Sequence, residues 1–500
     1  MPRALLLLAL ALPLACRSPN SPTPETTAVD TPDASPPTAK ELENHRELEA
    51  RMLGRKLGDI VVDREALPDG GERWQTKVSM TLALDDPGES AKHTESIEIV
   101  EYDKDKNFVR GSDVTREGDV EESKEIHREG DELVVRIKGP SHDKSSRFAI
   151  PKDFDSDVRV FDRLRREVEA GAALPHGTSY SSFDDSALRW EINRVTLLAK
   201  KRVDIGGLVL DAWELEEIDG DGERTVALMD DGGMPIRIEV GVFVAAIAGS
   251  DLFGTSGGET KLSSYLEVEG SIDASKDELK ISVQVASDDP KAPSIFHDNA
   301  YQAVKRGKDG RYELTLHAVR GTNLLARTLP LQGLPADVKS RLEPTPISQS
   351  DDAHIVAQAR QIVGSRTDAR EAAVAIVDWV HEHLGKRDGT RGAATAVEVL
   401  DAGFGDCTEH SALAVALLRA AGLPARNAAG IVLIPGFFGS EAGYHAWVEV
   451  WLGEWVVMDP ALGPTRAGPH YILLGHEEPG MSSGGAELAR LIGRTKIRVE

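Results

Sequence analysis

The chain has 500 residues, of which 40% are hydrophobic and 28% are charged. That length and composition suit two or three domains that each bury a core, and they exclude a disordered or collagen-like chain. The 58 Lys and Arg residues against 83 Asp and Glu residues give a net charge of −25, which disfavours nucleic acid as a partner. The chain has only two cysteines, Cys16 and Cys407, too few for a disulfide scaffold.

The first 16 residues have the pattern of an export signal. Arg3 precedes an apolar run over residues 4–12, and small residues lead up to Cys16. The run is too short to span a bilayer. The L-A-C ending resembles a bacterial lipobox, which implies cleavage before Cys16 and lipidation of its sulfur. We therefore predict a signal peptide over residues 1–15, and the alternative is an ordinary signal peptide that leaves a free thiol.

Residues 16–40 are rich in Pro, Ser and Thr, so we expect an extended, solvated tether behind the anchor. Beyond the export signal, no segment has eighteen consecutive apolar residues, so the sequence predicts no membrane-spanning helix. If Cys16 carries lipid, Cys407 is the one remaining thiol. A lone thiol in an export compartment is more often kept for chemistry than for structure.

The middle of the chain predicts mostly strands. Residues 41–58 are the exception, because a thin apolar stripe there predicts one amphipathic helix. Its members are Leu42, Leu48, Met52 and Leu57. Alternating or apolar runs predict strands at residues 74–84, 95–102, 132–137, 208–214, 225–229, 236–240, 279–285 and 312–317. A second helix is expected over residues 157–170.

Turn-like groups at residues 219–222, 230–233 and 307–310 separate several of these strands. The pattern predicts a large, mostly antiparallel β region, divided into a β-rich domain over 41–257 and a smaller β-rich domain over 258–345.

One acidic turn has oxygen ligands at alternating positions, Asp219, Asp221 and Glu223. Such spacing occurs in calcium loops, but the distal Glu of an EF-hand is missing at the required position. A plain hairpin turn is the favoured interpretation.

The chemistry-bearing residues follow residue 345. A helix is predicted over 367–384 with Thr367 as its cap, and a short one over 393–400. A buried helix is predicted over 407–421, after a tight turn at two glycines. Cys407 then lies in the first helical turn, where unpaired N–H groups and the helix dipole favour a thiolate.

A hairpin is predicted beyond that helix. His445 lies in an apolar-rich strand over residues 444–452, and Asp459 ends the next strand, over 454–460. A reversal at Gly453 and Glu454 would bring the two side chains together. A two-residue turn would not place them opposite each other, so a bulge or a longer turn is also open.

The strings G-F-G-D-C-T-E-H-S-A-L-A-V-A-L-L-R-A-A-G-L-P-A-R, H-A-W-V-E-V and W-V-V-M-D-P-A closely resemble the core of the transglutaminase-like superfamily, in its bacterial branch. The resemblance covers about residues 345–465. It implies an α+β chain whose papain-like catalytic domain spans 346–480, followed by a tail over 481–500. It also implies Cys407 as nucleophile, His445 as base and Asp459 as the orienting carboxylate.

The same resemblance implies acyl chemistry at amide carbonyls through a thioester on Cys407, with His445 moving the proton. Water as acceptor gives hydrolysis or deamidation, and an amine gives a crosslink. The backbone N–H of Cys407 is one candidate oxyanion donor. Papain-type enzymes carry a Gln six places before the nucleophile, where this chain has Asp401.

Other interpretations of these residues are open. Cys407 and His445 could be inert core residues, and Asp459 could simply open a turn with Pro460. His410 competes as the base because it lies one turn after Cys407. A zinc site from Cys407, His410 and His445 would lack the paired thiolates of structural sites. We predict no metal and no cofactor.

The sequence thus predicts an exported, lipid-anchored, transglutaminase-like cysteine enzyme of the bacterial cell envelope. Its substrates would be peptide or isopeptide amides of proteins or peptides there, with hydrolysis or deamidation favoured over crosslinking. The alternative is a non-catalytic envelope lipoprotein that uses the same fold to bind a partner.

Overall fold

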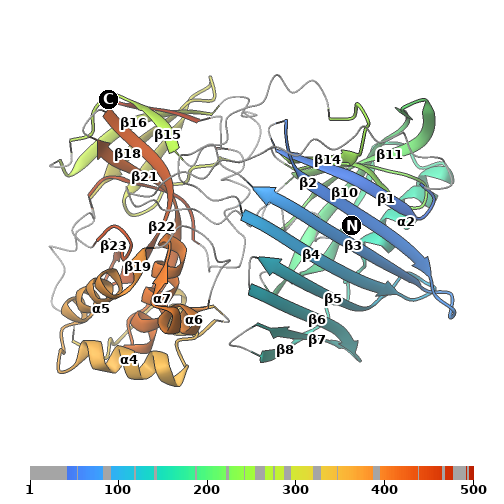
Figure 1. Cartoon of the computed structure of the whole chain (residues 1–500). Coiled ribbons are helices and arrows are strands. Elements are labelled where there is room, and N and C mark those ends of the chain that lie inside the picture. Colours follow the sequence, from blue (N-terminus) through green and yellow to red (C-terminus); the bar gives the residue numbers. More distant parts are fainter. Residues whose placement is uncertain are drawn as a thin grey trace. The chain divides into compact units, whose positions relative to one another are not determined.

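The computed structural model describes residues 42–52, 54–82, 92–117, 120–139, 143–185, 188–220, 224–240, 243–253, 265–273, 276–285, 294–318, 328–345, 347–386, 395–436, 439–463, 468–476, 491 and 495–500. These residues form two compact units, one before and one after residue 260 (Figure 1). Both are described separately below. The signal peptide, the tether with Cys16, and the acidic turn residues Asp221 and Glu223 lie outside the described residues. No helix in the described part of the chain is long and apolar enough to cross a membrane.

The first unit is built on one fourteen-stranded sheet in which every neighbouring pair is antiparallel. Its order is β8-β7-β6-β5-β4-β3-β2-β1-β14-β13-β12-β11-β10-β9. The strands are β1 (His45–Met52), β2 (Arg55–Ala66), β3 (Glu72–Leu82), β4 (Lys92–Tyr102), β5 (Phe108–Glu117), β6 (Val120–Glu129), β7 (Glu132–Lys138), β8 (Asp143–Ala149), β9 (His176–Asp184), β10 (Arg189–Ile205), β11 (Leu208–Ile218), β12 (Arg224–Met229), β13 (Pro235–Val240) and β14 (Phe243–Ile247).

The helix predicted over residues 41–58 is wrong, because this segment forms β1 and the start of β2. Leu48, Ala50 and Met52 are buried in alternation with more exposed residues, which is the period of a strand. Leu48 and Met52 are also four positions apart, so the same residues fit a helical stripe. Pairing of β1 with both β2 and β14 decides between the two patterns.

The predicted helix over 157–170 is confirmed as α2 (Asp157–Glu169), capped by Ser156 and buried through residues that include Phe161 and Leu164. Close to it the two edges of the sheet meet. Phe148 of β8 lies 4.9 Å from Phe183 of β9 between ring centroids. Phe154 forms a parallel bridge with Ser181 of β9. The sheet therefore curls until its edge strands are neighbours.

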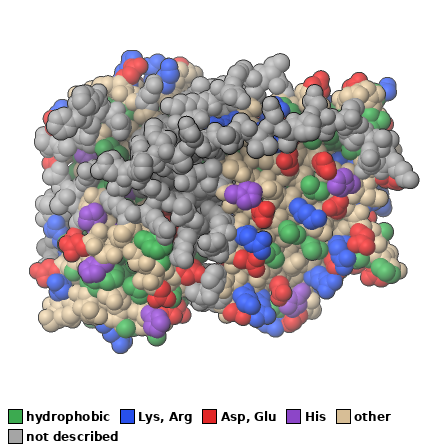
Figure 2. All heavy atoms as spheres, in the orientation of Figure 1, with side chains coloured by type: hydrophobic (Ala, Val, Ile, Leu, Met, Phe, Trp, Pro, Cys, Tyr) green, Lys and Arg blue, Asp and Glu red, His purple; other side chains and the backbone are tan. Residues whose placement is uncertain are grey.

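Acidic and basic side chains are interspersed over the sheet-rich unit on the face that Figure 2 shows. The strong negative charge of the chain is therefore not gathered into one patch on that face.

The second unit contains a nine-stranded sheet of order β17-β18-β16-β25-β15-β22-β21-β24, with β23 paired to β22. The strands are β15 (Tyr265–Glu269), β16 (Glu278–Val285), β17 (Gln302–Arg306), β18 (Tyr312–His317), β21 (Ala425–Gly436), β22 (Gly439–Trp451), β23 (Trp455–Met458), β24 (Tyr471–Gly475) and β25 (Thr495–Val499). The segment 258–345, expected to form a smaller domain, thus shares a sheet with strands of the catalytic segment. The expected tail over 481–500 supplies β25.

Each of the eight strands predicted for the middle of the chain is a strand of the structure. They are β3, β4, β7, β11, β12, β13, β16 and β18. Mostly antiparallel strands and a helical C-terminal segment confirm the predicted α+β class.

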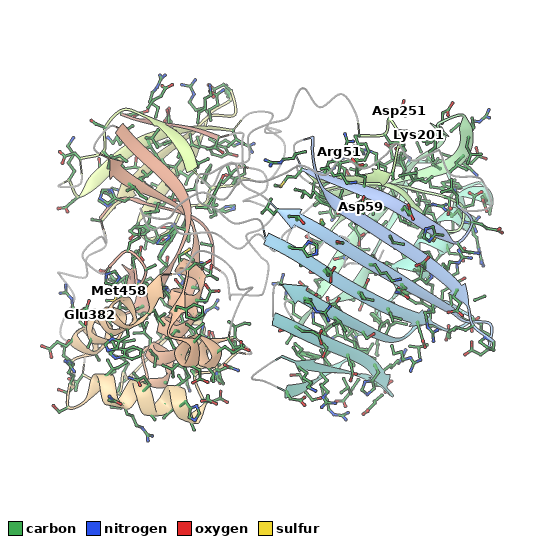
Figure 3. All side chains as sticks on the ribbon, in the orientation of Figure 1. Arg51, Asp59, Lys201, Asp251, Glu382 and Met458 are labelled. Carbon is green, nitrogen blue, oxygen red and sulfur yellow. The ribbon has the colours of Figure 1, made fainter. Side chains whose placement is uncertain are left out.

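Helices cover one part of the second unit. They are α3 (Ala336–Lys339), the 3₁₀ turn η1 (Ser340–Leu342), α4 (Ala353–Val363), α5 (Ala369–His383), α6 (Ala396–Ala402) and α7 (Cys407–Ala420), with the two-residue strands β19 (Gly385–Lys386) and β20 (Phe404–Gly405) between them. Figure 1 shows α5 and α6 on either side of α7. Met458 at the end of β23, labelled in Figure 3, belongs to the same apolar core as Ile376 and Val380 of α5.

The predicted cap of α5 is wrong by one residue. Asp368, not Thr367, precedes the helix, and its carboxylate accepts hydrogen bonds from the backbone N–H groups of Arg370 and Glu371. A carboxylate accepts two such bonds and adds negative charge at the positive end of the dipole, which favours Asp over the neighbouring Thr.

Candidate active site

Cys407 is the first residue of α7, as its sequence context predicted. Asp406 caps this helix, and its carboxylate accepts a 2.8 Å hydrogen bond from the Thr408 backbone N–H. Glu409 completes a capping box, because its Oε2 accepts a 2.9 Å bond from the Asp406 N–H. The thiol is therefore held at the positive end of a fourteen-residue helix.

The predicted glycine turn before this helix is also present. Gly403 ends α6 in the left-handed conformation, with φ of 72°. A Cβ atom at Gly405 would collide with the side chain of Glu409. Glycine at position 405 thus allows the chain to pass close to the capping box.

His445 of β22 and Asp459, just after β23, are in direct contact. His445 Nε2 lies 2.7 Å from Asp459 Oδ2, and each side chain is only 1% exposed. The paired residues Trp451 and Trp455 leave a three-residue turn between β22 and β23. This is the longer turn that the sequence left open, and the strand register makes the contact between the two side chains diagonal.

Asp459 accepts four hydrogen bonds. Oδ2 accepts a hydrogen bond from His445 and another, of 2.8 Å, from the hydroxyl of Tyr471. Oδ1 accepts hydrogen bonds of 2.9 and 2.8 Å from the backbone N–H groups of Ala461 and Leu462. Burial opposes ionisation, but the charge of His445 and these donors outweigh it and hold the pKa of Asp459 below its ordinary value. One carboxylate thus shapes the turn that follows it and orients the imidazole.

Asp459 contacts Nε2 of His445, so Nδ1 is the ring nitrogen that interacts with Cys407. Burial lowers the pKa of His445, but Asp459 and then a hydrogen bond and charge interaction with Cys407 raise it to about 10. The imidazole therefore holds its proton at neutral pH, as expected for an imidazolium beside a thiolate.

The Cys407 thiol is fully buried, with an exposed fraction of 0%, and packs with Ala446 and Ala461. A substrate therefore reaches the sulfur only after some of the surrounding residues move.

The family model of the transglutaminase-like superfamily matches residues 356–460. This segment is a transglutaminase-like domain. Its family supports a cysteine-based enzyme. No curated protein matches the chain.

Three solved structures show limited similarity to the whole chain. A protein from Cytophaga hutchinsonii, provisionally described as a cysteine protease, is 18% identical, covers 44% of this chain and 85% of its own, and has a TM-score of 0.31. A protein from Brucella abortus with a domain of unknown function is 15% identical, covers 41% of this chain and 95% of its own, and has a TM-score of 0.34. A protein from Parabacteroides distasonis, provisionally described as a protease, is 12% identical, covers 66% of this chain and 62% of its own, and has a TM-score of 0.17.

The competing residues of the transglutaminase-like domain have other roles. His410 Nδ1 lies 2.6 Å from the backbone carbonyl of Asp406, so this buried ring is bonded to its own helix. Asp401 is exposed on α6. Among the described residues, no group of three or more His, Cys, Asp or Glu side chains is arranged to hold a metal ion.

A second buried network lies on the same strand as His445. Glu449 accepts hydrogen bonds from Tyr301 at 2.7 Å and from Arg426 at 2.8 Å, and His476 lies 3.0 Å away. Arg426 also stacks over Trp455, at 4.0 Å from the ring centroid.

Sequence reasoning missed Tyr471, Asp406 and Glu409. The spacing of Asp406 and Glu409 is a recognisable capping-box signal just before an apolar run. Tyr471 has no such signal, because only the pairing of β24 with β21 brings its hydroxyl to Asp459.

Proposed function

We propose that the transglutaminase-like domain is a cysteine enzyme that cleaves peptide or isopeptide amides through a thioester on Cys407. The observation that carries this proposal is the 2.7 Å contact between His445 and Asp459, with the other ring nitrogen of His445 serving Cys407. Nucleophile, proton carrier and orienting carboxylate are the three parts that such chemistry needs.

In the first half-reaction, the Cys407 thiolate attacks the amide carbon and forms a tetrahedral intermediate. The His445 imidazolium then gives its proton to the departing amine as the carbon–nitrogen bond breaks, leaving a thioester. The Cys407 backbone N–H at the start of α7 is the donor we assign to the developing oxyanion.

In the second half-reaction, neutral His445 accepts a proton from water, and the resulting hydroxide attacks the thioester. The carbon–sulfur bond breaks, which releases the acid and restores the thiolate and the imidazolium. We favour water over an amine as the acceptor. Asp459 already holds four hydrogen bonds, so it is not left to bind a cationic amine.

We further propose that the protein is exported and anchored through lipid on Cys16, and that its substrates are proteins or peptides of the bacterial cell envelope. The export-signal pattern of residues 1–16 and the Pro-rich tether support this placement. Replacing Cys16 with Ser should move the protein from the membrane fraction to the soluble fraction. A wild-type protein that is already soluble would contradict the anchor.

The second candidate function is partner binding without catalysis, and complete burial of the Cys407 sulfur favours it. An amide-like chloroacetamide probe separates the two. In a Cys16→Ser background, where Cys407 is the sole cysteine, we expect labelling of the otherwise unchanged chain, none when Cys407→Ala is added, and a rate at least about 10-fold lower when His445→Ala is added. His354→Ala, at an exposed position on α4, serves as the control. A rate unchanged in folded His445→Ala would contradict the proposed role of His445.

The probe reports the nucleophile, and turnover requires a second measurement. Envelope peptides incubated with wild type and with Cys407→Ala should differ in cleaved or deamidated products by mass spectrometry. Labelling of Cys407 without any Cys407-dependent product would favour the non-catalytic alternative.

A further inference from the structure

The first unit contains a partly open cavity of about 160 Å³ that the proposed enzyme chemistry does not use. It lies within the curl of the fourteen-stranded sheet, and strands β4, β5, β6 and β9 to β12 contribute to its wall together with the start of α2. An apolar cavity of similar volume accommodates benzene, so the size suits a ligand of about six to ten non-hydrogen atoms.

The wall of the cavity carries far more acidic than basic side chains. The acidic residues are Glu98, Asp113, Asp155, Asp157, Asp185, Glu217 and Asp219, and the basic residue is Lys124. Lys124 pairs with Asp185 at 3.0 Å, and Arg163 pairs with Asp155 at 2.8 Å. Arg159 also lies 3.6 Å from Asp155, so three cations pair with two of the seven acidic side chains of the wall.

Neutral donors meet two of the remaining carboxylates. Ser96 and Thr115 donate to Asp113 at 2.8 and 3.0 Å. Tyr180 and Asn193 donate to Glu217 Oε1 at 2.8 and 3.0 Å. Hydroxyl and amide groups supply hydrogen bonds without neutralising charge, so a cation entering the cavity would still be attracted.

Three buried polar atoms at the cavity have no hydrogen-bond partner within the described ranges: the acceptors Asn193 Oδ1 and Glu98 Oε2, and the Ser182 hydroxyl, which can donate or accept. Asn193 is only 3% exposed, and its Oδ1 has no donor although its Nδ2 is bonded. Oε2 of Glu98 is likewise buried and has no donor. Buried acceptors normally receive a hydrogen bond, so acceptors facing a cavity indicate that its occupant is a donor.

Aromatic and apolar side chains make up much of the remaining wall, together with the polar residues Ser112, Ser156, Ser182 and Thr225. The aromatic members are Tyr102, Phe108, Phe154, Tyr180 and Phe183. Aromatic faces attract organic cations, and they also solvate an apolar body. The described residues include no cluster of three metal-ligating side chains, which favours an organic cation over a metal ion.

We propose that this cavity binds a small organic cation, namely a primary ammonium group attached to an apolar body of about benzene size. The ammonium group donates to Glu98 and Asn193, and the apolar body contacts the aromatic wall. Nothing in this proposal depends on the chemistry of Cys407.

Glu98 can lie in this wall without a cation beside it because it can hold a proton. Burial, together with Asp185 and Asp113, raises the pKa of Glu98 to about 8. The acid is therefore mostly neutral at pH 7 when no cation is present. A bound ammonium favours the carboxylate, and Glu98 then releases its proton to solvent.

The experiment measures binding of benzylammonium to the full-length protein by titration calorimetry, with benzyl alcohol as the uncharged probe of the same shape. We expect benzylammonium to bind at least about 10-fold more tightly than benzyl alcohol. Glu98→Gln and Asp113→Asn should each weaken benzylammonium binding by about 10-fold or more. Asp211→Asn, at an exposed position on β11 outside the cavity, should leave it unchanged.

Thermal unfolding of each variant verifies that it folds before its affinity is compared. Equal binding of the two probes would overturn the proposal, and so would unchanged affinity in both folded cavity variants. Binding of Ca²⁺ without binding of benzylammonium would also overturn it, because the site would then be a metal site.

Discussion

The hydroxyl of Tyr471 lies 2.8 Å from Oδ2 of Asp459, the same oxygen that His445 contacts. Tyr471 opens β24, which pairs with β21 on the far side from β22. The orientation of the imidazole therefore depends on a strand that lies outside the cysteine, histidine and aspartate motifs.

Tyr471→Phe should lower kcat/KM by about 3-fold to 10-fold, because it removes one hydrogen bond to a charged acceptor and keeps the ring. Steady-state cleavage of an amide substrate measures the effect. The matched control is Tyr444→Phe. Tyr444 directly precedes His445 in the sequence. Its hydroxyl is buried and has no hydrogen-bond partner among the residues that the structure describes. Equal activity of the two variants would contradict the role assigned to Tyr471.

Asp459→Asn should lower kcat/KM by about 10²-fold to 10⁴-fold, because the amide no longer stabilises the imidazolium. The same change should move the alkaline limb of the pH–rate profile to lower pH. Asp459 is the main group that raises the pKa of His445 to about 10, and the limb reports loss of that proton. An alkaline limb that stays in place would contradict this assignment. Asp401→Asn, at an exposed position, should leave the profile unchanged.

Burial of the Cys407 sulfur should make its alkylation depend strongly on the size of the reagent. In a Cys16→Ser background, where Cys407 is the sole cysteine, we expect iodoacetamide to react at least about 10-fold faster than a maleimide on a bulky carrier, relative to their rates with glutathione. Mass spectrometry of the intact protein gives both rates. Equal relative rates would show that the thiol is open in solution.

The capping box at α7 should contribute to stability through the hydrogen bond between Glu409 and the Asp406 N–H. Burial, together with the neighbouring Asp406, raises the pKa of Glu409 well above its ordinary value. Glu409→Ala should cost about 1–2 kcal/mol in urea unfolding, because the Asp406 N–H loses its acceptor. Glu409→Gln keeps an acceptor and should cost clearly less. Equal losses would mean that packing, and not the hydrogen bond, explains the effect.

Glu98 should make the stability of the first unit fall as pH rises. Its folded pKa of about 8 lies above the unfolded value of about 4.5, so the unfolded chain ionises first. The contribution of Glu98 to the free energy of unfolding is therefore highest below pH 4.5, declines between pH 4.5 and 8, and is constant above pH 8. The full difference amounts to at most about 5 kcal/mol. Glu98→Gln should flatten this part of the unfolding curve, whereas Asp211→Asn should not.

The helix carrying Cys407 and the strands carrying His445 and Asp459 could be predicted because each signal is local. Two glycines, an acidic cap and an apolar run define the start of α7, and a strand pattern precedes Asp459. The partners of Asp459 and Glu449 could not be predicted in the same way. Tyr471 and Tyr301 reach them from segments that are joined only by the sheet.

Strands β5 and β6 were missed for a physical reason. Strands are recognised by one apolar face, but Asp113 of β5 and Lys124 of β6 face the cavity, where apolar residues would otherwise be expected. The polar inner surface therefore hides these strands from a search for hydrophobic alternation. The error at β1 has a different cause. Leu48 and Met52 are apolar residues four positions apart, a spacing that fits both the period of a helix and the period of a strand.

The parallel pairing of β15 with β25 affects when the chain can fold. Glu269 and Arg498 form an ion pair across 229 positions of sequence, and β15 also pairs with β22, the strand of His445. During synthesis, β15 must wait for nearly half of the chain to emerge before this partner is available. The sheet that carries His445 therefore reaches its full set of strands only after residues 495–499 have been made.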